Sequence, residues 1–138
     1  MQVQPYLFFD GRCEEAVEFY RGALGAEVMA LMRFKDAPSE PDQSCKPPPG
    51  TENKVMHASF RIGDTTLLAS DGHCQGKPNF QGFSLALIAS SDAEADRLFS
   101  ALAEGGQVQM LLGKTFFSSR LGMVADRFGV SWMVYTAS

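Results

Sequence analysis

The chain has 138 residues, of which 45% are hydrophobic and 20% are charged, and its formal net charge is −4. This length and balance predict one folded domain. Its net negative charge and scattered lysines and arginines argue against a nucleic-acid partner, and no apolar run reaches the ~20 residues that a membrane span requires. The three cysteines, Cys13, Cys45 and Cys74, show no paired spacing, which favours reduced thiols and a cytoplasmic location.

The first half predicts a strand, a helix and three further strands. Residues 6–9 form a short apolar run, and residues 12–24 repeat apolar side chains at helical spacing. Asp10 is placed to cap the start of this helix, and Gly25 to end it. Strands follow at 28–34, 55–62 and 66–70. Residues 36–53 contain five prolines, so we expect an exposed loop there, of unassigned role.

The second half predicts the same series of elements. A strand at 83–89 leads to Ser90-Ser91-Asp92 with Glu94, which is typical of a helix start. Gly105-Gly106 ends that helix, and strands follow at 108–112, 121–128 and 131–136.

The two halves align with each other as an internal repeat. From Leu7, which matches Leu87, to Val28, which matches Val108, the matching residue numbers differ by 80. Around Gly63, which matches Gly129, they differ by 66. The offset shortens by 14 across the proline-rich loop, which we interpret as an insertion of that length. We therefore predict a single α+β domain over 1–138 made of two βαβββ modules, about 3–72 and 82–137. Each sheet keeps one face uncovered by its helix, which suits a concave ligand site.

Several segments resemble the vicinal-oxygen-chelate superfamily of glyoxalase I, extradiol dioxygenases and bleomycin and fosfomycin resistance proteins, and most closely its PhnB-like branch. They are residues 5–9, 15–20, 25–27, 55–58, 69–71, 116–117 and 126–132. The resemblance implies a glyoxalase-like fold, in which the paired modules form a cupped, incompletely closed mixed sheet around a cleft. It also implies a homodimer.

In the catalytic members of that superfamily, the resemblance implies a divalent metal held from the first and last strand of each module. The corresponding positions here are Pro5, Leu67, Ser84 or Leu85, and Met133. Proline, leucine and methionine are not useful ligands for Zn²⁺, Mn²⁺ or Fe²⁺. We therefore expect no cofactor at the usual metal centre.

Two polar residues are candidates for catalysis. His57 lies inside an apolar strand and is either a general base or ligand contact, or a satisfied structural histidine. Asp71 closes the next strand and either pairs with His57 in the cleft or caps a turn. A metal site from His73 and Cys74 with Cys45 or Asp71 lacks the usual spacing.

Apolar side chains on or between the predicted strands are candidates for lining the pocket: Leu67, Phe116, Trp132, Met133 and Tyr135. The residues alone do not separate this role from plain core packing. No glycine-rich cofactor loop follows a strand, so a methyltransferase activity gains no support.

The leading hypothesis is a PhnB-like domain that binds a small molecule in a mostly apolar cleft, without the usual metal. One alternative is a metal-dependent lyase, isomerase or dioxygenase that uses non-standard ligands such as His57 and Asp71. Another is a resistance protein that sequesters an antibiotic.

Overall fold

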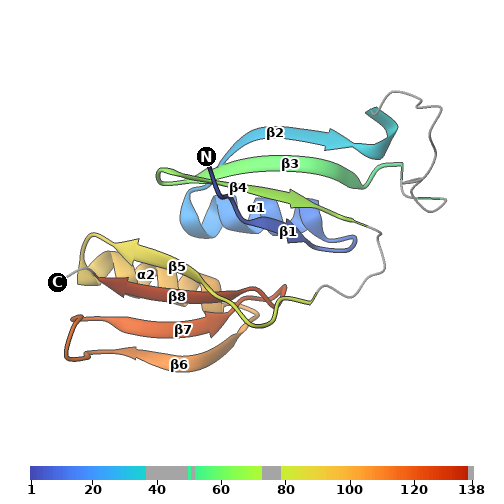
Figure 1. Cartoon of the computed structure of the whole chain (residues 1–138). Helices are drawn as coiled ribbons and strands as arrows, with labels where there is room; N and C mark the ends of the chain where they lie inside the picture. Colours follow the sequence, from blue (N-terminus) through green and yellow to red (C-terminus); the bar gives the residue numbers. More distant parts are fainter. Residues whose placement is uncertain (37–49, 51, 73–78, 137–138) are drawn as a thin grey trace. The chain divides into compact units, whose positions relative to one another are not determined.

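The computed structural model describes residues 1–36, 50, 52–72 and 79–136, and the chain divides into two compact units, Met1–Pro78 and Asn79–Ser138 (Figure 1). Unit 1 contains β1 (Tyr6–Phe8), α1 (Cys13–Leu24), β2 (Glu27–Arg33), the short 3-10 helix η1 (Phe34–Asp36), β3 (Val55–Ile62) and β4 (Thr65–Ser70). Unit 2 contains β5 (Leu85–Ala89), α2 (Asp92–Ala103), β6 (Gln107–Gly113), β7 (Leu121–Ala125) and β8 (Ser131–Thr136). No helix in the described part of the chain is long and apolar enough to cross a membrane.

Each unit has one four-stranded mixed sheet. The strand orders are β1-β4-β3-β2 and β5-β8-β7-β6, with β1–β4 and β5–β8 parallel and the other pairs antiparallel. In each unit the helix lies against one face of the sheet (Figure 1). The predicted pair of βαβββ modules is therefore confirmed, while most of the expected loop at 36–53 lies outside the described residues.

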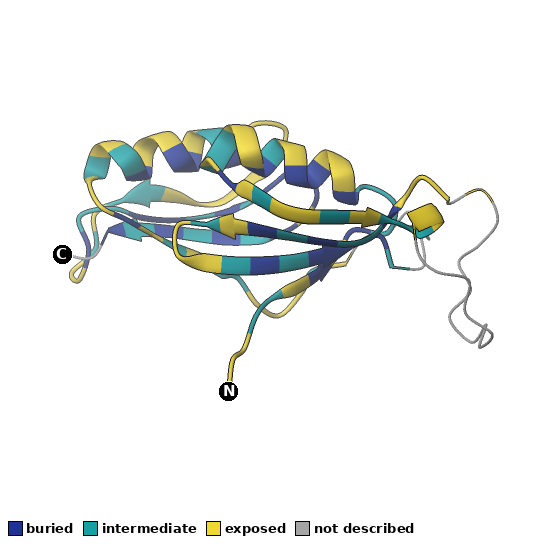
Figure 2. Cartoon of the chain, turned by 90° about the horizontal axis from the view of Figure 1, so that it is seen from above, coloured by how far each residue is buried: buried dark blue, intermediate teal, exposed yellow. Residues whose placement is uncertain are grey.

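The core of unit 1 lies between α1 and its sheet. Tyr20 of α1 stacks on Phe60 of β3 with ring centroids 5.8 Å apart, and it also contacts Phe9. Ala58 and Ala69 pair across β3 and β4 beneath the helix and are fully buried. Figure 2 shows the resulting pattern, in which the buried residues of each helix form a stripe and the opposite side is exposed. This burial of aromatic and aliphatic side chains drives the unit to fold.

The core of unit 2 follows the same plan with different side chains. Trp132 and Val134 of β8 are buried, and they alternate with the less buried Ser131, Met133 and Tyr135. Gly122 of β7 lies directly beneath the ring of Phe99 from α2, and an added Cβ would stand only 2.8 Å from that ring. The close approach of α2 to β7 therefore requires glycine at this position.

The two helices begin in different ways. The side chain of Ser91 caps α2 by accepting a hydrogen bond from the backbone N–H of Glu94, and the Glu94 carboxylate accepts one from Ser90. The Ser91 cap confirms the predicted helix start. The prediction that Asp10 caps α1 is wrong, since the cap residue is Arg12 and has no side-chain cap. Gly25 ends α1 in the left-handed conformation, as predicted (φ 68°).

Strand pairing corrects the predicted register of the repeat. The offset of 80 holds for the first strands and for β2 and β6. In the later strands, Phe60 of unit 1 is equivalent to Val124 of unit 2, and Leu68 is equivalent to Met133. Neither pair keeps the predicted offset of 66. The insertion between β2 and β3 is therefore longer than predicted, and the last hairpin turn of unit 2 is longer than its counterpart in unit 1.

Candidate functional site

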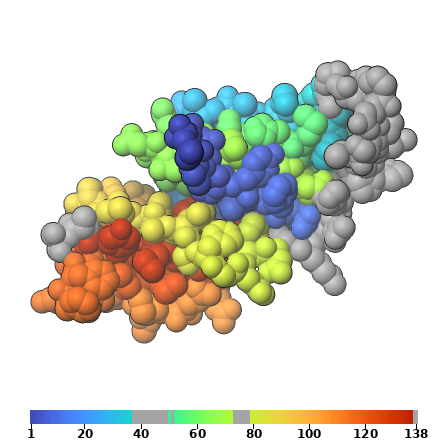
Figure 3. Space-filling model, in the orientation of Figure 1, coloured from blue at the N-terminus to red at the C-terminus, as the bar shows by residue number. Residues whose placement is uncertain are grey.

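The candidate site lies on the open face of unit 1, by which we mean the side of its sheet that faces away from α1. On β1, Tyr6 and Phe8 flank the buried Leu7 and remain 40% and 52% exposed. On β3, His57 points to the same side, and its cross-strand neighbour on β2 is Met32, which is 43% exposed. These side chains reach solvent because the strand alternation that buries Leu7 directs them outward. Figure 3 shows the segment around β1, in blue, at the surface of unit 1.

A polar pair joins β1 and β3 at this face. The phenol oxygen of Tyr6 lies 3.0 Å from Nδ1 of His57, within hydrogen-bonding distance. The two rings are tilted, with centroids 5.7 Å apart, and Tyr6 also stacks on Phe8 at 4.9 Å with an angle of 23°. His57 is therefore held by a tyrosine that is itself held by a second aromatic ring.

The local environment keeps Tyr6 protonated. Partial burial raises the pKa of the Tyr6 phenol, and the Cys13 thiol adds a smaller effect in the same direction. Because the ordinary tyrosine pKa is already about 10, the phenol is neutral at physiological pH. It is available there as an O–H donor to the imidazole.

Asp71, the other candidate catalytic residue, is placed away from solvent and bound to the backbone. It is 1% exposed, and its two oxygens accept hydrogen bonds from the N–H groups of Gly11, Cys13 and Val55 at 2.7–2.8 Å. These contacts tie the end of β4 to the start of α1 and the start of β3. Asp71, from the end of β4, thus accepts the hydrogen bonds at the start of α1 that Asp10 was expected to accept. We interpret this as a structural role.

The residues predicted to line a pocket divide between the two sides of the sheets. Met133 and Tyr135 lie on the open face of unit 2, the side of its sheet away from α2. Leu67 and Trp132 are buried on the helix sides of their units, where the indole N–H of Trp132 donates to the Asp126 carboxylate at 2.9 Å. Phe116 stands in the loop before β7 and is fully exposed.

Methionines dominate the middle of the open face of unit 2. Met110 pairs with Met123, and Met123 pairs with Met133, so the three form one row across β6, β7 and β8. Ala86 continues the row on β5. Methionine side chains adapt to the shape of what they contact, so the middle of this face provides apolar surface. Its polar contacts lie at the start of β8, where the Ser131 hydroxyl bonds the Ser84 hydroxyl and the Gln109 side chain.

The donor set does not fit the metal centre of the superfamily. Pro5, Ser84 and Leu85 occupy the first-strand positions, and Leu67 or its neighbour Leu68 and Met133 occupy the last-strand positions. None offers the imidazole or carboxylate that Zn²⁺, Mn²⁺ or Fe²⁺ requires. Within residues 1–36, 50, 52–72 and 79–136, no three His, Cys, Asp or Glu residues group as metal ligands. The suggested site at His73 and Cys74 with Cys45 lies outside the described residues.

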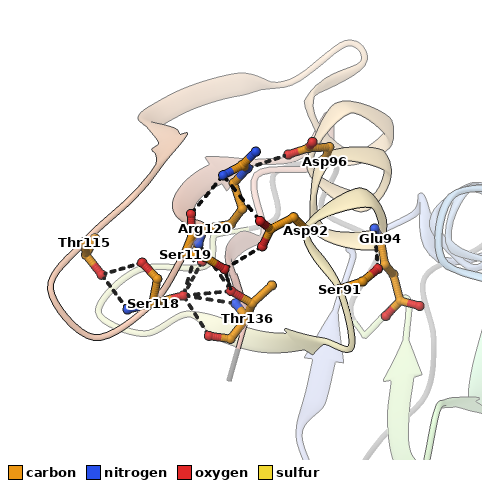
Figure 4. Close-up of polar contacts among 9 residues, drawn as sticks. All are labelled: Ser91, Asp92, Glu94, Asp96, Thr115, Ser118, Ser119, Arg120 and Thr136. Atoms are coloured by element: carbon orange, nitrogen blue, oxygen red, sulfur yellow. Dashed lines mark hydrogen bonds and ion pairs between the residues drawn. The ribbon is translucent and has the colours of Figure 1, made fainter. Parts of the chain in front are cut away.

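A second polar cluster occurs where the loop before β7 meets the start of α2 (Figure 4). The Ser119 hydroxyl bonds the Asp92 carboxylate and the Thr136 hydroxyl, and the buried Ser118 hydroxyl bonds the backbone oxygens of Arg120 and Thr136. The Arg120 guanidinium donates to Asp96 on the next turn of α2. No buried side-chain polar atom of the cluster lacks a hydrogen-bond partner. We therefore interpret the cluster as a structural contact that holds the loop against the helix.

Comparisons with known proteins identify the family. The family described as 3-demethylubiquinone-9 3-methyltransferase matches residues 1–135. The chain belongs to this PhnB-like family. Protein YjdN of Escherichia coli is 33% identical, over 97% of this chain and 94% of YjdN. The predicted resemblance is thereby confirmed for nearly the whole sequence.

Solved structures of PhnB-like relatives show the same fold. Protein PA1353 of Pseudomonas aeruginosa is 43% identical, with a TM-score of 0.85 over 99% of this chain and 98% of that one. A Bacillus cereus protein described as a putative 3-demethylubiquinone-9 3-methyltransferase, PhnB protein, is 28% identical, with a TM-score of 0.80 over 99% and 100%. The fosfomycin resistance protein FosX of Listeria monocytogenes, 11% identical with a TM-score of 0.66 over 100% and 93%, shares the fold alone. The glyoxalase-like fold predicted from the sequence is confirmed.

Proposed function

We propose that this PhnB-like protein binds a small organic molecule on the open face of unit 1, where Tyr6 and His57 provide the polar contact. The hydrogen bond between these two side chains at an exposed, largely apolar surface is the observation that carries the proposal. Small-molecule sites combine apolar walls with a few placed polar groups. Phe8, Met32 and Leu68 provide such walls around the pair.

We further propose that binding proceeds without the metal centre of the superfamily. The positions that would carry it hold side chains of the wrong chemistry, and Asp71 already uses both oxygens on backbone N–H groups. The competing proposal is a metal-dependent enzyme that recruits His57. Elemental analysis of untagged protein separates the two, because stoichiometric metal that disappears in His57→Ala would overturn the metal-free proposal.

A ligand screen by native mass spectrometry tests the binding proposal. We expect compounds that remain bound to wild-type protein to be lost from His57→Ala. They should be retained by Ile88→Ala, since Ile88 is an exposed side chain on the open face of unit 2. Compounds that bind both variants equally would place the site elsewhere. Recovery of the bound compound unchanged or altered then distinguishes a binding protein from an enzyme.

The family resemblance also supports a homodimer in the cytoplasm. Light scattering should give twice the chain mass of 15.0 kDa, and a value near the single-chain mass would contradict the dimer. The buried free thiol of Cys13 suits a reducing compartment. Localisation of a tagged protein by cell fractionation tests this second point.

A further inference from the structure

We infer that Tyr6 fixes the tautomer of His57 with its proton on Nε2, and that the ligand is a flat aromatic ring carrying a hydrogen-bond acceptor such as a carboxylate. This inference rests on the proposed function and names its ligand class. Tyr6 is a positioning residue, and the Nε2–H group of His57 is the contact with the ligand.

The direction of the hydrogen bond follows from the chemistry of the two groups. A neutral phenol is a good donor and a poor acceptor, whereas an unprotonated imidazole nitrogen is a good acceptor. With Tyr6 protonated, the favourable arrangement is O–H of Tyr6 donating to Nδ1 of His57. A neutral imidazole carries one N–H, so its proton then lies on Nε2. Nε2 has no hydrogen-bond partner among the described residues, which leaves this donor for a ligand.

The aromatic preference follows from the rings next to this donor. Tyr6 and Phe8 stack nearly parallel, and both remain well exposed on one side of the sheet. Aromatic rings prefer offset-stacked or edge-to-face neighbours, and such contacts add binding energy beyond that of the buried area. A flat ring packed against the exposed part of Tyr6 lies next to both Phe8 and His57, because Tyr6 contacts both of those rings.

Apolar side chains complete the site. Leu68 pairs with Tyr6 across β1 and β4, and Met32 pairs with His57 across β2 and β3. A methionine thioether also makes favourable contacts with aromatic rings. The equivalent places in unit 2 hold Ala86 for Tyr6 and Leu121 for His57, so unit 2 has no tyrosine–histidine pair there.

The first experiment needs no ligand. Long-range ¹H–¹⁵N NMR spectra of the ¹⁵N-histidine-labelled full chain report which ring nitrogen is protonated, and His73→Gln assigns the only other histidine. At a pH where the ring is neutral, we expect His57 to show a strongly populated Nε2–H tautomer in wild type. Tyr6→Phe should release it to a mixture, and Tyr135→Phe, which removes a hydroxyl from unit 2, should not. An unchanged spectrum in Tyr6→Phe would overturn the tautomer assignment.

The second experiment compares benzoate with cyclohexanecarboxylate, which have the same charge and ring size but differ in aromaticity. We expect benzoate to bind about three- to tenfold more tightly and to shift the His57 Nε2 signal. Phe8→Ala should remove the difference, and Ile88→Ala should preserve it.

The outcomes separate the inference from the proposed function. Equal affinity for the two acids at His57 would overturn the aromatic class and leave the small-molecule site standing. No response of His57 to either acid would overturn the ligand class. If, in addition, no compound retained in the mass-spectrometry screen shifts the His57 signal, the proposed binding site is overturned. A second copy of the chain found to cover Tyr6 and Phe8 would overturn it as well.

Discussion

The two units share one topology but differ at the same place on their open faces. Unit 1 has Tyr6 and His57 where unit 2 has Ala86 and Leu121. The strand order, the parallel outer pair and the covering helix are identical. The helix side of each sheet preserves the fold, because the core there requires close packing. The open face carries no such requirement, so its chemistry differs between the units.

The buried aspartates of the two units differ in reach. Asp71 joins backbone groups 16 to 60 residues away in sequence, whereas Asp126 binds Phe128, Val130 and Trp132 within its own hairpin. Asp71→Ala leaves three buried or part-buried backbone donors without acceptors. We therefore expect it to reduce the free energy of unfolding by about 3 kcal/mol or more, measured by urea denaturation. Asp64→Ala, in the exposed turn of the same unit, is the matched control, and an equally small loss in both variants would contradict the role of Asp71.

Gly106 tests the tighter packing of unit 2. Its equivalent in unit 1 is Ala26, which accommodates a Cβ, but a Cβ on Gly106 would overlap the Ala125 backbone oxygen. We expect Gly106→Ala to destabilise the protein by about 1–3 kcal/mol, as seen in thermal unfolding. Gly22→Ala in α1 has open space around it and should instead be neutral or stabilising by up to ~1 kcal/mol. If both substitutions destabilised the protein, or both stabilised it, the proposed difference in packing between the two units would be contradicted.

Cys13 gives unit 1 a dependence on pH that unit 2, with Ala93 at the equivalent place, lacks. Burial raises the pKa of the Cys13 thiol, and the Asp71 carboxylate adds to this shift. The native thiol stays protonated, while the unfolded thiol ionises above about pH 8.5. Its contribution to stability is therefore complete below that pH and falls above it, by at most about 1.4 kcal/mol per pH unit.

Two measurements check this prediction. The loss of stability between pH 8.5 and 10 should be steeper in wild type than in Cys13→Ala, and parallel curves would contradict it. In a Cys45→Ser/Cys74→Ser variant, Cys13 should react with a thiol reagent only after denaturant is added. Rapid reaction of the native protein would show that the thiol is accessible.

The helix starts give the smallest expected effect. Ser91→Ala removes the cap of α2 and should cost about 1 kcal/mol, while Arg12→Ala at the corresponding place of α1 removes no side-chain cap. Circular dichroism melting of both variants checks the difference. Equal losses of thermal stability in the two variants would show that the Ser91 side chain does not stabilise α2 as a cap.

The sequence predicted the elements and the repeat because both depend on local patterns. The spacing of apolar residues located both helices, and Ser91 with Glu94 marked one helix start. The sequence did not predict the register of the later strands. Aligning the glycines of the two hairpin turns ignored the different lengths of those turns. Strand pairing, which decides the face that each side chain occupies, cannot be read from such an alignment. As a result, the sequence alignment matched Leu67 with Met133, whereas the true counterpart of Met133 in unit 1 is Leu68.

The candidate site was only half visible in the sequence. His57 was recognised as a polar residue in an apolar strand, but its partner Tyr6 lies 51 residues away. The alternation of Tyr6, Leu7 and Phe8 was the available signal for an outward-facing ring. Asp71 could not be assigned, because a strand-end carboxylate looks the same whether it caps distant backbone groups or faces a ligand.

The most direct test of the central claim is the side-chain NMR response to the compound retained most strongly in the mass-spectrometry screen. With ¹⁵N-histidine and ¹³C-methyl-methionine labels, His57 and Met32 report on the open face of unit 1, and Met110, Met123 and Met133 report on that of unit 2. We predict that the compound shifts His57 and Met32 and that His57→Ala abolishes binding. Shifts confined to the three methionines of unit 2, with binding unchanged in His57→Ala, would contradict the account.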